Sequence, residues 1–384
     1  IDLPRFWRMS NNMPTAPMAG IRVIDFTTVI AGPYCTRLLS DCGAEVIKIE
    51  SETGDLIRAV PPISDGASSY FAHLNCGKKS AVLDLRSEDG LSAARKLIAS
   101  ADVVVENFRP GVMKRLGLDY ATLAVDHPDL IYCAISGFGQ TGPRAMEPAY
   151  APMIHAGSGL DMAQLQYQDE LTRPEKCGVY TADVMSAIFA FGAIQTALLG
   201  KERNGVGQFV DVALMDSVIN LLVYECQLAQ FPDAPARILY PPTAALDGFV
   251  IVTPIGQRIF EDMADAMGHP EWKTDPRFIT APDRREHWGE VVDCMESWTS
   301  TRTARDCEDQ LIAAGVPCSR YRTVGEAMTD PQSVARGVMA KVDDADGGFL
   351  VPNPPFKFGD GTVGVVPSAP GLGEHTEALL AALE

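Results

Sequence analysis

One carboxylate stands at the head of an almost wholly apolar stretch of this sequence. Asp183 is followed by residues 184–199, whose only polar side chains are Ser186, Gln195 and Thr196. Apolar runs of this kind form buried helices, and an acidic residue at the start often caps the free N–H groups of the first turn. A carboxylate held there can also act as a nucleophile or a base. Asp183 is therefore either a helix cap or a catalytic group.

Other catalytic chemistries have little support in the residue spacing. The nine cysteines are scattered without a C-x-x-C pair, the six histidines include no H-x-x-x-H pair, and G-x-S-x-G is absent. We therefore expect no metal site and no hydrolase-type serine. Scattered unpaired cysteines are typical of reduced thiols, so we expect the protein to be cytoplasmic.

Charge and length narrow the choice of partners. The chain has 384 residues and a net charge of −18, which is unfavourable for nucleic-acid binding. The apolar stretch looks too short and too interrupted to cross a membrane, and no secretory signal is evident. The first eight residues are set aside because Met9 or Met13 is the expected native start.

Alternating strand and helix patterns should position Asp183. Apolar strands are expected at 21–26, 45–50, 79–85, 102–108 and 130–139, with helices between them at 34–44 and 87–101. This order predicts an open parallel α/β sheet, which binds ligands beyond its strand C-termini. We expect a large domain over 14–228, a small α+β domain over 240–340 and a return to the large domain over 345–384.

Six segments in order resemble family III CoA-transferases. They include "VIDFTTVIAGPYCTRLLSDCGAEVIKIE", "NCGKKSAVLDL", "ADVVVENFRPGVMKRLGL", "SGFGQTGP" and "GKERNGVGQFVDVALMD". The family contains formyl-CoA:oxalate and carnitine CoA-transferases and alpha-methylacyl-CoA racemases. The resemblance implies a Rossmann-like large domain, a small domain and an interlocked homodimer. It also implies no permanently bound cofactor, with an acyl-CoA thioester and a free carboxylic acid as substrates.

The resemblance also implies roles for individual residues. It makes Asp183 the nucleophile that exchanges CoA through an aspartyl mixed anhydride and an aspartyl-CoA thioester. The residues it implies for CoA binding are Val29, Ile30, Ala31, Leu74, Asn75, Lys78, Asn107, Phe108 and Arg115. Some relatives place an arginine after the second strand, where this chain has Ser51 and Glu52. Phosphate binding should then depend on Lys78, Arg109 and Arg115, or be weaker.

Two further departures bear on the reaction. Formyl-CoA transferase has a glycine run between its domains, but residues 238–252 here have none, which disfavours formyl transfer to oxalate. A racemase pairs the aspartate with a His-Asp motif, at whose positions this chain has Tyr150 and Ala151. His155 follows on a predicted helix and is expected to face elsewhere. The prediction is a CoA-transferase; a racemase and a non-catalytic CoA-binding homologue remain alternatives.

Overall fold

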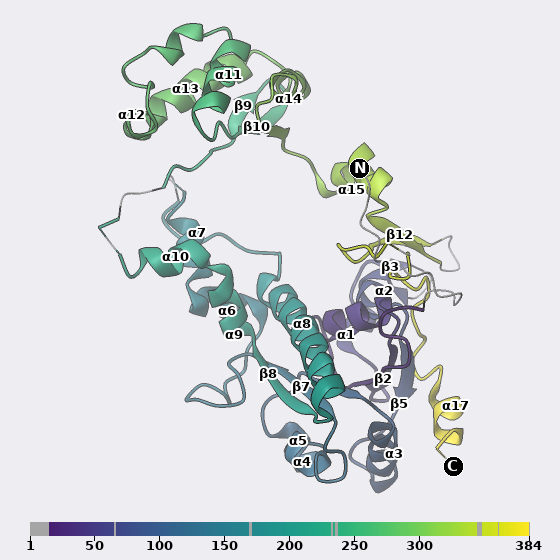
Figure 1. Ribbon diagram of the computed structural model, residues 1–384. Helices are drawn as coiled ribbons and strands as arrows, with labels where there is room; N and C mark the ends of the chain where they lie inside the picture. The colour runs from purple at the N-terminus through teal and green to yellow at the C-terminus, as the bar shows by residue number, and fades with distance from the viewer. Residues whose placement is uncertain are drawn as a thin grey trace. The chain divides into compact units, whose positions relative to one another are not determined.

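A computed structural model describes residues 15–64, 67–168, 171–231, 233–234, 237–343, 348–359 and 361–383. The expected starts at Met9 and Met13 lie outside these ranges. The chain forms two compact units (Figure 1). The larger one takes the described residues up to Gln230 and from Ala335 onward, and the smaller one is Phe231–Val334. The domain boundaries expected from the sequence are residues 228, 240, 340 and 345.

A six-stranded parallel sheet forms the centre of the larger unit. Its order is β5-β2-β1-β6-β7-β8. The strands are β1 (Arg22–Asp25), β2 (Glu45–Glu50), β5 (Lys79–Val82), β6 (Val103–Glu106), β7 (Ile131–Ser136) and β8 (Gln208–Ala213). Ile24 is aligned with Ile47 on one side and with Val104 on the other. The strand order runs outward in both directions from β1 and β6, so the topological switch point lies between these two strands.

Helices cover both faces of this sheet. Figure 1 shows α1 and α8 on one side and α3, α4 and α5 on the other. Alternate strand residues divide accordingly, with Val23 and Val105 in one core and Ile24 and Val104 in the other. The helices are α1 (Ala31–Asp41), α2 (Ser69–Asn75), α3 (Glu88–Ala99), α4 (Val112–Leu116), α5 (Tyr120–Leu123), α6 (Ala151–Ser158), α7 (Leu160–Leu165), α8 (Thr181–Asn204), α9 (Leu214–Leu221) and α10 (Val223–Leu228).

The apolar stretch after Asp183 forms α8, a helix of 24 residues. It packs against α1, α9, β7 and β8. By length and composition alone it is the one helix in the described part of the chain that could cross a membrane. This corrects the sequence estimate that the stretch is too short, because the helix starts before Asp183 and runs on through Lys201 and Arg203.

The smaller unit has its own apolar core around Phe260, Trp272 and Leu311. Its antiparallel sheet has the order β11-β10-β9. The elements are β9 (Thr243–Ala245), β10 (Gly248–Val252), α11 (Gln257–Ala266), α12 (Ala281–Glu286), α13 (Trp288–Thr299), α14 (Ala304–Ala313), β11 (Cys318–Arg320) and α15 (Val324–Thr329). The segment without a glycine run therefore forms the β9–β10 hairpin.

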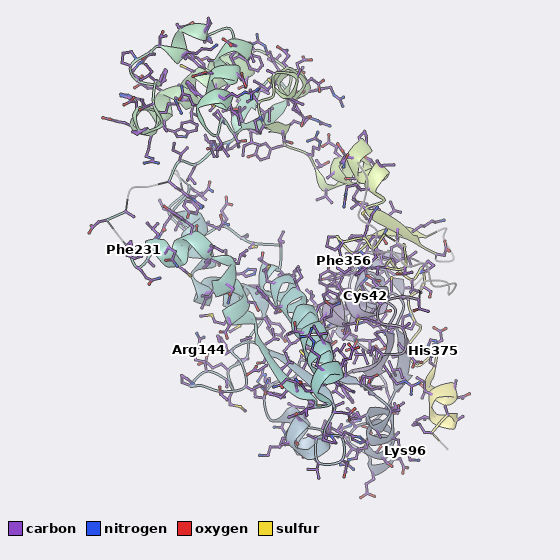
Figure 2. The ribbon with its side chains drawn as sticks, in the orientation of Figure 1. Cys42, Lys96, Arg144, Phe231, Phe356 and His375 are labelled. Atoms are coloured by element: carbon purple, nitrogen blue, oxygen red, sulfur yellow. The ribbon has the colours of Figure 1, made fainter. Side chains whose placement is uncertain are left out.

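The end of the chain returns to the larger unit through α16 (Pro331–Arg336), β12 (Met339–Val342), β13 (Phe349–Pro352) and α17 (Thr376–Ala381). β12 and β13 form a hairpin. His375, labelled in Figure 2, accepts a hydrogen bond from the Ser80 backbone N–H at 3.3 Å. The tail thereby attaches to the sheet edge at β5.

Candidate active site

The loops after β1 and β6 are tied together at the switch point. The Asn107 amide accepts a hydrogen bond from the Thr28 N–H at 2.9 Å and donates one to the Thr28 carbonyl at 2.8 Å. One side chain thus satisfies both backbone groups of the neighbouring loop. Asn107 was expected to contact CoA, and here it also fixes the crevice in which a ligand of this fold would lie.

Val29 has a strained backbone in this crevice. Its φ of 70° is the one positive value among the non-glycine residues that the structure describes. A β-branched residue rarely adopts it, and such strain costs roughly 1–3 kcal/mol. The Val29 N–H donates to both carboxylate oxygens of Asp55 at 3.2 Å. Asp55 forms a fully buried ion pair with Lys48, whose ammonium also donates to the Thr27 carbonyl at 2.7 Å. The buried ion pair between Asp55 and Lys48 therefore fixes the backbone of this loop.

A second buried ion pair, between Lys78 and Asp25, lies under the same loop. The Lys78 ammonium donates to Asp25, to the Pro33 carbonyl and to Asn75 at 2.8–3.0 Å. Burial would raise the pKa of Asp25, but Lys78 and Lys48 outweigh it and hold that pKa at about 2. The expected phosphate ligand Lys78 is thus buried with three protein acceptors.

Asp183 opens into a cavity of about 280 Å³ within the larger unit. The cavity is also lined by five of the expected CoA-binding residues: Val29, Ile30, Ala31, Asn107 and Phe108. Leu74, Asn75, Lys78 and Arg115 do not line it. Leu74 packs beneath with Ile30, and Arg115 is exposed on α4. The structure thus brings Asp183 to the switch-point loops and leaves these four residues elsewhere.

Asp183 is the third residue of α8, and its side chain caps nothing. The N-cap position is Tyr180, which makes no side-chain capping bond, and the Asp183 carboxylate accepts no hydrogen bond from the residues that the structure describes. Burial raises its pKa to about 6. The cap interpretation of Asp183 is therefore wrong in this structure. A half-buried carboxylate without hydrogen bonds is a better nucleophile than a fully solvated one, because fewer contacts must break before it attacks.

Sequence reasoning missed Tyr70, on α2, which lies close enough to Asp183 to feel its charge. Burial and then the negative charge of Asp183 raise the pKa of Tyr70, so its phenol stays protonated. It also missed Arg144, labelled in Figure 2, which stacks over Phe138 and pairs with Glu147 in the cavity wall. Tyr70 belongs to no recognisable motif, but Arg144 directly follows the "SGFGQTGP" segment, so the sequence could have indicated Arg144.

The residues at the racemase positions lack a base. Tyr150 lines the cavity, and Ala151 is buried at the start of α6. His155 is 1% exposed, and its Nε2 accepts the Ala182 N–H at 3.0 Å. The lone pair that would remove a proton is therefore occupied by the backbone of α8.

A second hollow of about 470 Å³ adjoins the Asp183 cavity. Thr28 and Phe108 line both. Ser51, Glu52 and Asp55 lie in its wall beyond β2, and Arg86, which pairs with Asp84, is the cation that lines it within the described residues. Sequence position could have indicated Asp55 and Arg86, because each follows the C-terminal end of a parallel strand, β2 and β5 respectively.

Known proteins are similar to this chain over nearly its whole length. The model of CoA-transferase family III matches residues 18–376. Acetyl-CoA:oxalate CoA-transferase of Acetobacter aceti is 37% identical over 377 residues, with 95% of both chains covered. Succinate–glutarate CoA-transferase of Agrobacterium fabrum is 34% identical, with 98% of this chain and 97% of the relative covered.

A solved structure extends the likeness to the fold. A CAIB/BAIF family protein from Brucella suis superposes with a TM-score of 0.83 at 32% identity, over 97% of this chain and 100% of that one. The expected mixed α/β fold is confirmed. The named relatives move CoA between acids, so the racemase alternative is not favoured. The expected resemblance is confirmed as well, and the chain belongs to CoA-transferase family III as an acyl-CoA-dependent enzyme.

Proposed function

We propose that this protein moves CoA from an acyl-CoA thioester to a free carboxylic acid with Asp183 as the covalent nucleophile. The supporting observation is that the Asp183 carboxylate shares one cavity with the switch-point loops at Thr28–Ala31 and Asn107–Phe108. A carboxylate with a pKa of about 6 is about nine-tenths ionised at pH 7, so it needs no separate base.

The exchange consists of four balanced steps. An Asp183 oxygen attacks the thioester carbonyl, the C–S bond breaks, and a mixed anhydride and CoA thiolate result. The thiolate attacks the Asp183 carbonyl carbon, the C–O bond breaks, and the donor acid leaves as its carboxylate. The acceptor carboxylate then attacks the aspartyl-CoA thioester and releases thiolate. Finally, the thiolate attacks the acceptor carbonyl, which forms the new acyl-CoA and restores Asp183.

The two adjoining hollows suit the two ends of CoA. We place the thioester in the Asp183 cavity and the nucleotide in the hollow beyond β1, β2 and β5, with the pantetheine passing Thr28 and Phe108. Glu52 is exposed in that hollow. A carboxylate beside a phosphate is unfavourable, which supports the expectation that phosphate is held more weakly here than where an arginine occupies this position.

We further propose that the acceptor is a short dicarboxylic acid and that the donor is succinyl-CoA or acetyl-CoA. The names of the two relatives refer to oxalate, succinate and glutarate. Arg109 lines the Asp183 cavity, is exposed, and has no side-chain partner among the described residues. Its guanidinium can bind the carboxylate that does not react.

We also propose that the protein is a cytoplasmic homodimer without membrane or nucleic-acid partners. On α8, Val184, Ile188 and Phe189 are 37–45% exposed although the helix is mostly apolar. A contiguous apolar surface of this kind is usually covered by a partner.

The decisive experiment combines a substitution with chemical trapping. Asp183→Ala should lose CoA exchange by more than about a hundredfold, because the covalent path disappears. Asp216→Ala is the matched control, since Asp216 is an exposed carboxylate in the first turn of α9. Wild-type protein loaded with acyl-CoA should react with hydroxylamine at Asp183 alone, and a matrix of donors and acids should identify the substrates by the masses of the products. Exchange retained by Asp183→Ala would contradict the proposal.

A further inference from the structure

The first turn of α8 is held by a side chain from another helix. A helix leaves its first N–H groups without intrahelical partners, and a side chain at the N-cap usually accepts one of them. At the start of α8 the N-cap is Tyr180, which makes no such bond. The Ala182 N–H is instead accepted by the His155 Nε2 at 3.0 Å. His155 belongs to α6 and precedes Ala182 by 27 residues in the chain.

This contact is built into the core and leaves the imidazole little freedom. His155 is 1% exposed, and Ile154 and Ala182 beside it pack in the same apolar cluster. The other ring nitrogen, Nδ1, is buried and has no hydrogen-bond partner among the described residues. A nitrogen that accepts an N–H carries no proton, so the ring proton is on Nδ1 and the imidazole is neutral.

Ala182 directly precedes Asp183, so the position of its backbone determines that of the carboxylate. The helix that carries His155 begins at Ala151, next to Tyr150 in the wall of the Asp183 cavity. One hydrogen bond therefore connects the nucleophile's turn to the cavity wall. Placement matters because a displacement of about 1 Å in a reacting group can cost about a hundredfold in rate.

We propose that His155 is a positioning residue for Asp183. By accepting the Ala182 N–H, it fixes the first turn of α8 and holds the carboxylate where it meets the thioester. His155 exchanges no proton with substrate, because its accepting nitrogen is already bonded to the helix. The inference rests on the proposed role of Asp183 and adds the residue that sets its position.

The test compares two substitutions of similar bulk. His155→Phe keeps the packing but removes the acceptor, and we expect kcat to fall about 10- to 100-fold while KM for acyl-CoA changes less than about threefold. His155→Gln restores an acceptor oxygen and should bring kcat back to within about threefold of wild type. Wild-type kcat in the Phe variant would overturn the proposal. So would an equal loss in both variants, because an acceptor oxygen at this position would then not restore the placement of Asp183.

A measurement on the native protein covers the case in which a variant does not fold. Nitrogen NMR of histidine-labelled wild-type protein should show His155 as the neutral tautomer protonated on Nδ1. A proton on Nε2 would overturn the proposal without any substitution. Asp183→Ala is assayed in parallel. If that variant exchanges CoA, the proposed function fails; if it is inactive while His155→Phe is fully active, only the positioning inference fails.

Discussion

At the scale of single residues, Asp183 combines burial with a lack of hydrogen bonds. Burial raises its pKa to about 6, and no other group is needed to account for this shift. A helix N-terminus favours the charged form, by about 0.3–1 kcal/mol at exposed sites. In this structure burial outweighs that preference. The carboxylate therefore remains ionised at neutral pH but is weakly stabilised, which suits a group that must attack.

The raised pKa predicts opposite effects of pH on activity and on stability. Exchange requires the carboxylate, so kcat should fall as pH decreases through about 6. The folded-state pKa lies above the unfolded value, so the folded state binds the proton more tightly and ionisation costs stability as pH rises from about 4 to about 6. Asp183→Asn should then stabilise the fold at pH 8 by at most roughly 3 kcal/mol, which raises the melting temperature, and at pH 4.5 by only about 1 kcal/mol.

Pre-steady-state rates and thermal scans from pH 4.5 to 8 would measure both effects, with Asp216→Ala as the control. A rate that stays flat to pH 4.5, or equal melting temperatures for Asp183→Asn and wild type at pH 8, would contradict the burial of an ionised Asp183.

Substitutions of Lys78 and of Arg115 should give different results in a binding experiment, although sequence reasoning gave both residues the same role. Lys78 is buried against Asp25, so Lys78→Ala strands a buried charge and should destabilise the fold by about 3–5 kcal/mol. Any loss of binding should be the same for CoA and for a phosphate-free pantetheine thioester. Arg115 is exposed and lines neither hollow, so Arg115→Ala should leave the binding of both ligands unchanged. Arg86 lines the proposed nucleotide hollow, so Arg86→Ala should weaken CoA binding about tenfold and spare the pantetheine thioester. Titration calorimetry with both ligands distinguishes these results, and a CoA-selective loss in Lys78→Ala would restore its phosphate role.

At the scale of elements, the loop after β1 depends on the segment that follows β2. Asp55 accepts the Val29 N–H and pairs with Lys48, so the strained turn at Val29 is stabilised from the neighbouring strand. Neither partner lies in the loop itself. The position of the cavity wall therefore depends on a buried ion pair that does not line the Asp183 cavity.

Asp55→Asn tests this dependence. The amide leaves the Lys48 charge unpaired, so we expect a loss of roughly 3 kcal/mol in stability and an increase of several-fold in KM for acyl-CoA as Val29 relaxes. Glu52→Gln is the matched control for stability only, because Glu52 is exposed in the same segment but lines the proposed nucleotide hollow. Chemical denaturation would check both variants, and steady-state kinetics would compare Asp55→Asn with wild type. Unchanged stability in Asp55→Asn would show that the ion pair contributes nothing to the loop.

The sequence predicted the central strands well, because residues 21–26, 45–50 and 102–108 are short apolar runs between turns. Prediction from the sequence was less accurate where tertiary packing determines the structure. Residues 215–230 look like one helix, but the structure interrupts them at Leu222 between α9 and α10. The buried roles of Lys78 and Asn75 also escaped prediction, since a lysine in a polar segment looks exposed until β1 and α2 enclose it.

At the scale of the whole molecule, the chain crosses between its two units twice. It leaves the larger unit after Gln230 and returns at Ala335. The expected dimer of threaded chains requires such a path, because a closed excursion can enclose a second chain. Composition and length predicted two domains, but sequence periodicity carries no information on assembly. The expected dimer therefore stays a prediction, supported by the apolar surface of α8.

Sedimentation of the wild-type protein and of a variant on α8 should test this dimer. Wild-type protein at low micromolar concentration should sediment with twice the mass of the chain. Ile188→Glu places a charge on the 45% exposed apolar surface and should yield monomer or aggregate, because charges at the centre of an interface are unfavourable. Val125→Glu is the control, since Val125 is 79% exposed beyond α5 and should leave the mass unchanged. A stable, folded wild-type monomer would refute the dimer. It would also mean that α8 presents its apolar side chains to solvent, a costly arrangement for the helix that carries Asp183.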